Sequence, residues 1–235
     1  MRSILIIILC FFSGQLFAQE INQFDAQGER HGKWTKNYDN SKILRYEGEF
    51  NHGKETGTFK FYKNVDGKAV LAVTREFVPN SEVVHVTFYD TNKNIVSKGG
   101  MKDKIQVGKW VYYHKGGGLV MMEEFYNDNG KLEGEKKTYY KNGVVAEKAN
   151  FKDGVLDGVS EWFSEKGVLI RLFNYTNGAL EGPSKSYDSD GKIKMEGVYR
   201  NDLKHGIWKF YENGKLVREK DFTKRSKNPY KNKNK

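Results

Sequence analysis

The stretch GKWVYYHKGGGL, residues 108–119, decides the fold, because its pattern returns along the chain. It contains an opening glycine, an aromatic segment, and a glycine-rich turn followed by leucine. A close copy, GIWKFYENGKL, occupies residues 206–216. Aromatic residues favour β-strands and glycine supplies turn conformations, so each copy indicates a strand followed by a turn.

The opening glycine recurs at a nearly constant spacing. It stands at positions 32, 57, 108, 134, 158, 182 and 206, and the last three intervals are each 24 residues. The 51-residue gap from 57 to 108 holds two units, with the hidden start near Val84, where the glycine is missing. Such a period is the signature of a stacked repeat array. The sequence therefore predicts about eight units between residues 32 and 222.

Each unit carries turns centred on Asn-Gly or Asp-Gly, for example Asn142-Gly143 within a unit and Asp153-Gly154 between units. Both residues of such a turn tolerate positive φ, which makes this pair the strongest short-range hairpin signal. A lone hairpin is marginal in water, so the units must stack edge to edge. We expect an all-β fold: an elongated, single-layer antiparallel meander of about eight β-hairpin repeats that forms a twisted ribbon.

We expect the opening glycine to leave space for an aromatic ring of a neighbouring unit, so that rings stack along the ribbon. The rings are also candidate binding residues, because aromatic side chains dominate binding hot spots. The face on which each one lies is left open, because strand register is not known from the sequence. The candidates are Trp34, Trp110, Tyr112, Tyr139, Trp162 and Trp208.

Residues 1–18 have the anatomy of a secretory signal peptide: Arg2, then an apolar run through Phe12, then a small residue, Ala18, before Gln19. We expect cleavage near Ala18/Gln19 and export to the periplasm, the outer membrane or the medium. Cleavage would remove Cys10, the only cysteine. The mature chain would then be held by packing alone.

The remaining chain divides into an N-terminal lead-in (19–31), the hairpin array (32–222) and a disordered basic tail (223–235). The formal net charge is +10, and much of it lies in the tail. This charge allows an anionic membrane or cell-wall partner, although solubility explains it more simply. Export argues against a nucleic-acid partner, and we expect a monomer.

No pattern of catalytic residues is apparent. The chain has five histidines, and His31 and His205 both precede an opening glycine at opposite ends of the array. There is no His-x-x-x-His pair, no Gly-x-Ser-x-Gly motif and no cysteine after cleavage. We therefore expect a protein that is not an enzyme, with no catalytic residue, no cofactor and no metal site.

The phrase Gly-Lys-Trp-Val-Tyr-Tyr-His-Lys-Gly-Gly-Gly-Leu at 108–119, with its close copy at 206–216, resembles the variant MORN repeat, in particular that of bacterial YwqK-like antitoxin proteins. The resemblance covers roughly 28–222 and implies an elongated sheet that binds proteins or lipids. Choline-binding cell-wall repeats are a weaker match, since those are nearer 20 residues and richer in tryptophan, whereas this chain has 4 tryptophans.

These observations favour an exported scaffold protein that binds a protein or envelope partner through its repeat sheet. One alternative is an antitoxin-like protein that neutralises a toxin by direct contact. Another is binding of anionic lipid or cell-wall glycan.

Overall fold

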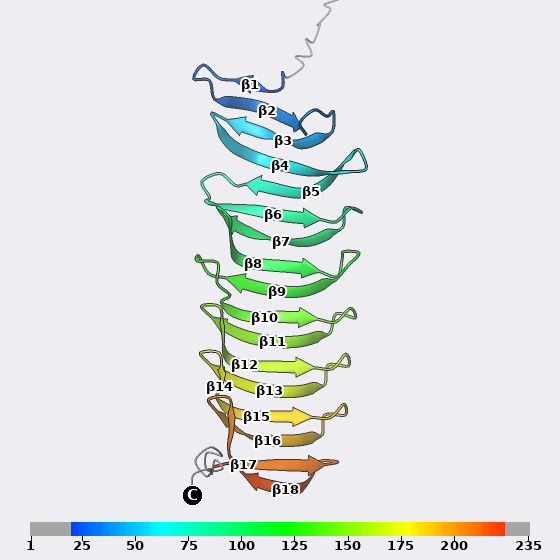
Figure 1. The fold of residues 1–235 in the computed structure, drawn as a ribbon, viewed down its shortest axis with the longest axis vertical. Coiled ribbons are helices and arrows are strands. Elements are labelled where there is room, and N and C mark those ends of the chain that lie inside the picture. Colours follow the sequence, from blue (N-terminus) through cyan, green and yellow to red (C-terminus); the bar gives the residue numbers. More distant parts are fainter. Residues whose placement is uncertain (1–19, 224–235) are drawn as a thin grey trace, which may run out of the picture.

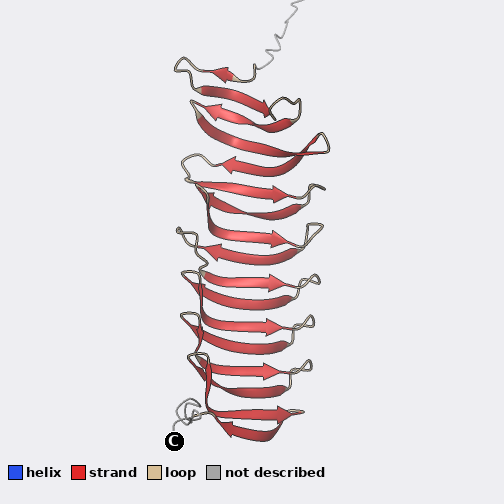
Figure 2. Cartoon of the chain, in the orientation of Figure 1, coloured by secondary structure: helices blue, strands red, loops and turns tan. Residues whose placement is uncertain are grey.

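A computed structural model describes residues 20–223 of the chain. The expected signal peptide (1–18) and nearly all of the basic tail lie outside these residues. The described part is one 18-stranded antiparallel sheet (Figures 1 and 2). Over residues 20–223 there is no helix, and so none long and apolar enough to cross a membrane. The strands are β1 (Gln23–Phe24), β2 (Arg30–Asn37), β3 (Leu44–Asn51), β4 (Lys54–Val65), β5 (Lys68–Phe77), β6 (Val83–Tyr89), β7 (Ile95–Lys102), β8 (Ile105–Tyr113), β9 (Val120–Tyr126), β10 (Gly134–Tyr139), β11 (Val145–Lys152), β12 (Val155–Phe163), β13 (Leu169–Thr176), β14 (Ala179–Leu180), β15 (Gly182–Tyr187), β16 (Ile193–Arg200), β17 (Leu203–Glu212) and β18 (Lys215–Asp221).

The predicted fold class is confirmed. From β2 to β18 the chain forms eight hairpins, and each pairs with the next, so that the ribbon grows along one axis with β1 at one end and β18 at the other (Figure 1). The hidden unit near Val84 is the hairpin β6–β7. Most turns between hairpins are tight: Asp153 and Gly154, between β11 and β12, both have positive φ, 49° and 87°. The connections β5–β6 (78–82) and β9–β10 (127–133) are longer. The lead-in is part of the sheet, because β1 pairs with β2.

The expected role of the opening glycines is wrong. At Gly108 and Gly206, for example, an added Cβ would meet nothing within 4 Å, so no ring lies over them. They have positive φ instead, 65° and 67°, and sit where the pairing with the preceding strand shifts register. The opening glycine is therefore a bulge residue, required for its left-handed backbone, and it bends the strand in every repeat that carries it.

A different set of glycines receives the rings. A Cβ on Gly99 would lie 2.4 Å from the ring of Trp110, and a Cβ on Gly197 would lie 2.3 Å from that of Trp208. Gly48 faces Phe59 in the same way. Each glycine stands 11 residues before its ring, on the strand paired with it. The rings lie flat against the bare backbone, which buries Trp110 to 1 % and Trp208 to 0 % exposure although residues 20–223 form no second layer over the sheet.

Side chains alternate along the first strand of each hairpin, which gives the ribbon two unlike faces. Residues two and four positions after the opening glycine lie on one side, here called the aromatic face; Trp208 and Phe210 are an example. Residues one, three and five positions after it lie on the other, here called the charged face; Lys209 and Tyr211 are an example. The largest fully buried side chains, those of Phe59, Trp110 and Trp208, form a core row at the second position of the aromatic face.

This core row is not aromatic throughout. Ser160 and Ser184 occupy the ring position in their repeats and are 1 % and 2 % exposed. The residue paired with Ser160 on β11 is Ala149 and not glycine. A small side chain at the ring position leaves space for a Cβ on the facing strand. Ser160 therefore faces alanine, whereas Trp110 and Trp208 face glycine.

Acidic residues next to the opening glycine bind the turn that leads from one hairpin to the next. The carboxylate of Glu133 accepts a hydrogen bond from the backbone amide of Asp153 at 3.0 Å. In the same way, the carboxylate of Asp157 accepts from the backbone amide of Asn177 at 3.0 Å, and that of Glu181 accepts from the amide of Asn201 at 2.9 Å. Each acceptor lies 20 residues before its donor, so the acid at the start of a repeat satisfies the turn that ends the same repeat.

Candidate functional site

The charged face carries a repeated tyrosine–glutamate contact between neighbouring hairpins. The hydroxyl of Tyr62 donates to Glu47 at 2.7 Å, that of Tyr139 to Glu123 at 2.8 Å, and that of Tyr211 to Glu196 at 2.7 Å. In each case the tyrosine stands five residues after an opening glycine. The contact therefore recurs because the repeat places the same two positions side by side.

A lysine completes each of these groups. Lys60 lies 3.1 Å from Glu47, Lys109 lies 2.6 Å from Glu123, and Lys185 lies 3.5 Å from Glu196. We call the three groups Tyr62/Glu47/Lys60, Tyr139/Glu123/Lys109 and Tyr211/Glu196/Lys185 the polar triplets. All of their side chains lie at the surface or are half-buried. The triplets hold charge and hydrogen-bonding groups in fixed positions on an accessible face.

The triplets shift the ionisation of their members. Burial, followed by the hydrogen bond to glutamate, raises the pKa of Tyr62 and of Tyr139 to about 12. The hydroxyl of Tyr62 lowers the pKa of Glu47, and that of Tyr211 lowers the pKa of Glu196. Lys109 is the main cause of the lowered pKa of Glu123. At neutral pH the glutamates are therefore anionic and the tyrosines are neutral donors.

The sequence-predicted aromatic candidates fall into separate environments. Trp110 and Trp208 are core residues and cannot reach a partner, so their assignment to a binding surface is wrong. Their Nε1 groups also point inward, to the carbonyls of Gly100 and Val198 at 2.9 and 3.1 Å. The glycine facing each ring explains this burial.

The other four candidates are half-buried. Tyr112 and Trp162 lie on the aromatic face, each four residues after an opening glycine. Tyr139 lies on the charged face. Trp34 is at the N-terminal end, where it donates to the carbonyl of Gln23 at 3.0 Å and packs against the edge of Phe24. The candidates therefore do not form one surface.

A buried acidic residue interrupts the aromatic face at the middle of the ribbon. Glu124 is 5 % exposed and accepts a hydrogen bond from Tyr126 at 2.7 Å. Lys136 lies 3.4 Å away and supplies the opposite charge. Burial, then the contact with Glu124, raises the pKa of Tyr126 well above its usual range. This cluster compensates its own charge, which indicates a structural role.

The C-terminal end of the ribbon is cationic. Lys204 Nζ lies 4.2 Å from the centre of the Trp208 ring, and Arg218 lies 4.3 Å from that of Phe210. Burial lowers the pKa of Lys204. Strand β18 is exposed along its whole length, including Leu216 and Val217. The last described strand thus presents basic and apolar groups together at the C-terminal edge of the sheet.

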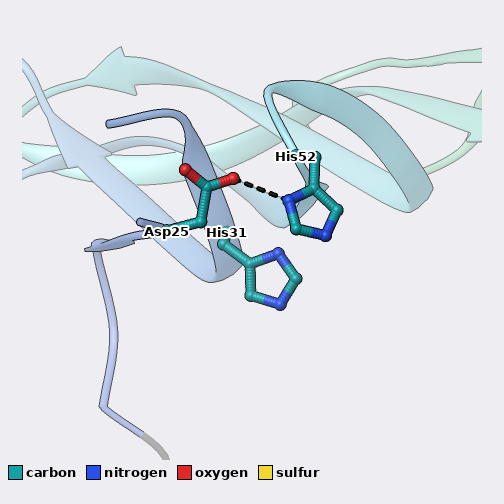
Figure 3. A group of neighbouring side chains, drawn as sticks. All are labelled: Asp25, His31 and His52. Carbon is teal, nitrogen blue, oxygen red and sulfur yellow. Dashed lines mark hydrogen bonds and ion pairs between the residues drawn. The ribbon is translucent and has the colours of Figure 1, made fainter. Parts of the chain in front are cut away.

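A group of potential metal ligands lies at the opposite end. One ligand atom from each of Asp25, His31 and His52 lies within 4.8 Å of the others (Figure 3). His52 Nδ1 is 2.7 Å from Asp25 Oδ2, and the two imidazole rings are 4.8 Å apart between centres. No sequence motif pointed to this cluster. The signal that could have found the cluster is the repeat itself, since His31 and His52 are about one unit apart.

The repeat geometry explains why these residues meet. His31 precedes an opening glycine, as Glu133 does, and His52 heads a tight turn, as Asp153 does. The two histidines therefore occupy the positions that elsewhere form the acid-to-turn hydrogen bond. Asp25 comes from the loop between β1 and β2, where its Oδ1 accepts the amides of Gln27 and Glu29 at 3.0 and 2.8 Å. The backbone amide of Glu29 is the main cause of the lowered pKa of Asp25.

The fold and its faces define a hairpin-repeat protein whose units stack only on their neighbours. Comparison with family models identifies the repeat: residues 132–153, 156–177, 180–201 and 204–224 match the MORN repeat variant. The chain therefore carries MORN repeats over residues 132–224, as the sequence resemblance predicted. Each match begins two residues before an opening glycine, and the hairpins before residue 132 continue the same register pattern.

Proposed function

We propose that the protein is an exported, non-enzymatic interaction protein whose charged face binds a protein partner. The observation that carries this proposal is the set of polar triplets. Each triplet presents a lysine and a glutamate from two neighbouring strands, each of which is paired on both sides, so a partner meets groups whose conformational freedom is already restricted. Fixed charges of both signs favour specificity over simple attraction.

The spacing of the triplets suggests the shape of the partner. Neighbouring strands are about 4.8 Å apart, so one hairpin advances the ribbon by about 10 Å. The triplets lie on different hairpins, which spreads them along the ribbon. A partner with an extended or repetitive surface matches this arrangement better than a small molecule does, since small-molecule sites are concave pockets.

The experiment is capture from envelope extracts with the mature chain as bait, followed by titration of the purified partner. Replacing Tyr62, Tyr139 and Tyr211 by phenylalanine, together with Lys60, Lys109 and Lys185 by glutamine, should weaken binding at least tenfold while circular dichroism stays unchanged. The matched control is Tyr112→Phe with Trp162→Phe on the aromatic face, which should bind normally. Equal binding by the triplet variant and the parent chain would refute the charged face as the binding surface.

A second candidate function is attachment to an anionic surface, either lipid or cell-wall polymer. The observation that favours it is the cationic C-terminal end, with Lys204, Arg218 and exposed β18. A chain that ends at Thr223 keeps this cationic end and lacks the basic tail, so it tests how much of the attachment depends on the tail. Loss of binding to vesicles with anionic lipid, with partner binding retained, would separate an electrostatic tether from the protein-binding face.

Export depends on the N-terminal segment. An intact mass that places the first residue at or near Gln19, after expression in a bacterial host, would support it. A full-length chain retained in the membrane would contradict it. Neutralisation of a toxin by contact is the same mode of binding with a particular partner, and the identity of the captured protein decides it.

A further inference from the structure

We propose that Asp25, His31 and His52 form a binding site for a divalent transition-metal ion of the zinc class, which joins the N-terminal loop to the first inter-repeat turn. This site is independent of the proposed partner-binding face. Its ligands come from three separate backbone segments: the β1–β2 loop, the start of β2 and the β3–β4 turn (Figure 3).

The donor set determines the class of metal. Two imidazole nitrogens and one carboxylate oxygen suit zinc, copper, nickel or iron, whereas calcium and magnesium prefer oxygen ligands alone. A tetrahedral Zn²⁺ with bonds of about 2.0–2.1 Å places its ligand atoms about 3.4 Å apart. The present atoms lie within 4.8 Å of one another, so small rotations of the side chains reach that geometry.

The ligands differ in how firmly they are held. The side chain of Asp25 is 8 % exposed, and two backbone amides bind its Oδ1, which leaves Oδ2 directed at His52. The side chain of His52 is 61 % exposed, and His31 is also exposed. A fixed carboxylate with two imidazoles that can turn is able to accept an ion from solvent and still leave a coordination position for water.

The position of the cluster gives the ion a structural task. The first hairpin has a repeat neighbour on one side only, and β1 covers its other side with two residues. In later repeats an acid binds the next turn through a hydrogen bond, as Glu133 binds Asp153. His31 cannot supply a carboxylate at that position. A bound ion would restore the link between His31 and the next turn, and would also fix the loop that carries Asp25.

Other repeats provide substitutions that remove the ligands and keep the backbone. Asn127 holds a loop in the same way as Asp25, with its Oδ1 accepting amides two and four residues on. Thr56 precedes Gly57 as His31 precedes Gly32. Asn177 heads a tight turn with φ of 49°, close to the 46° of His52. The test variant is therefore Asp25→Asn with His31→Thr and His52→Asn, and the control is His205→Thr at the equivalent position of the last repeat.

The test is isothermal titration of the untagged chain with zinc chloride, followed by melting curves with and without the ion. We expect one Zn²⁺ per chain, a higher melting temperature with zinc, and binding weakened at least about tenfold in the triple variant. The control should behave as the parent. Histidine ¹H–¹⁵N spectra should show zinc-dependent shifts at two of the five histidines. Equal zinc binding by the triple variant, or equally tight binding of calcium, would overturn the proposal.

Discussion

Replacing Gly197 by alanine should destabilise the ribbon through a single contact. The new Cβ would lie 2.3–2.6 Å from three atoms of the Trp208 ring, where carbon atoms prefer about 3.5–4.0 Å. The ring therefore has to move by about 1 Å. It has little space to do so, because it is 0 % exposed, is packed against Tyr199 with ring centres 5.0 Å apart, and donates to the carbonyl of Val198 at 3.1 Å.

The magnitude follows from these contacts. Overpacking a filled site costs about 1–3 kcal/mol, and a weakened hydrogen bond adds about 1 kcal/mol. Alanine recovers about 0.5–1 kcal/mol, because it restricts the unfolded chain more than glycine does. We therefore expect Gly197→Ala to lower the free energy of unfolding by about 1–3 kcal/mol.

A double-mutant cycle isolates the cause. Trp208→Ala alone should cost about 3–5 kcal/mol, and adding Gly197→Ala to it should cost nothing further, because no ring remains to clash. The assay is urea unfolding monitored by circular dichroism. The dependence of the unfolding free energy on urea concentration should be the same in all variants. The control is the reverse change, Ala149→Gly, opposite Ser160, which should cost only about 1 kcal/mol. Additive effects of Gly197→Ala and Trp208→Ala within about 0.5 kcal/mol would refute the contact.

Three further predictions follow from the same structure. Trp110→Ala should destabilise more than Trp34→Ala in urea unfolding, because Trp110 is 1 % exposed and Trp34 is half-buried at the terminal repeat; equal losses would argue against nearest-neighbour stacking. Ser160→Ala and Ser184→Ala should each stabilise by about 1 kcal/mol, because their buried hydroxyls have no hydrogen-bond partner within residues 20–223; a loss of stability would show that the hydroxyls are satisfied. The folded pKa values of Glu47 and Glu196 are lowered from 4.5, so their stabilisation is present above that pH and is lost as pH falls through the folded values. Tyr62→Phe with Tyr211→Phe should therefore reduce the loss of stability in acid, whereas Tyr38→Phe, whose hydroxyl donates to a backbone carbonyl, should not.

The repeat period and the turn residues were enough to predict the hairpins and their stacking. Asp153-Gly154 illustrates why: its conformation is a local property of two residues, and the following hairpin depends on little else. The period also located the hidden unit near Val84, although that unit lacks its glycine.

Contacts between strands were not predictable in the same way. Gly99 and Gly108 look alike in the sequence, yet one lies under a ring and the other forms a bulge. Only the register of β7 against β8 separates them. The burial of Trp110 depends on the same register, so the sequence alone does not separate it from a surface ring. His31 and His52 meet through a loop-to-turn contact that requires the repeats to be superposed in space.

The direction of the hydrogen bonds has a mechanical consequence. The strands run across the ribbon, so their backbone hydrogen bonds lie along its long axis, and the described chain begins and ends at opposite ends (Figure 1). Tension applied between those ends would pull the terminal strand away from its neighbour, so the backbone hydrogen bonds of one strand at a time would carry the load. Each released repeat of about 24 residues would add roughly 80 Å of extended chain. A ribbon of this kind yields at low force, in equal steps that start from its ends, and can lengthen without losing the repeats between them.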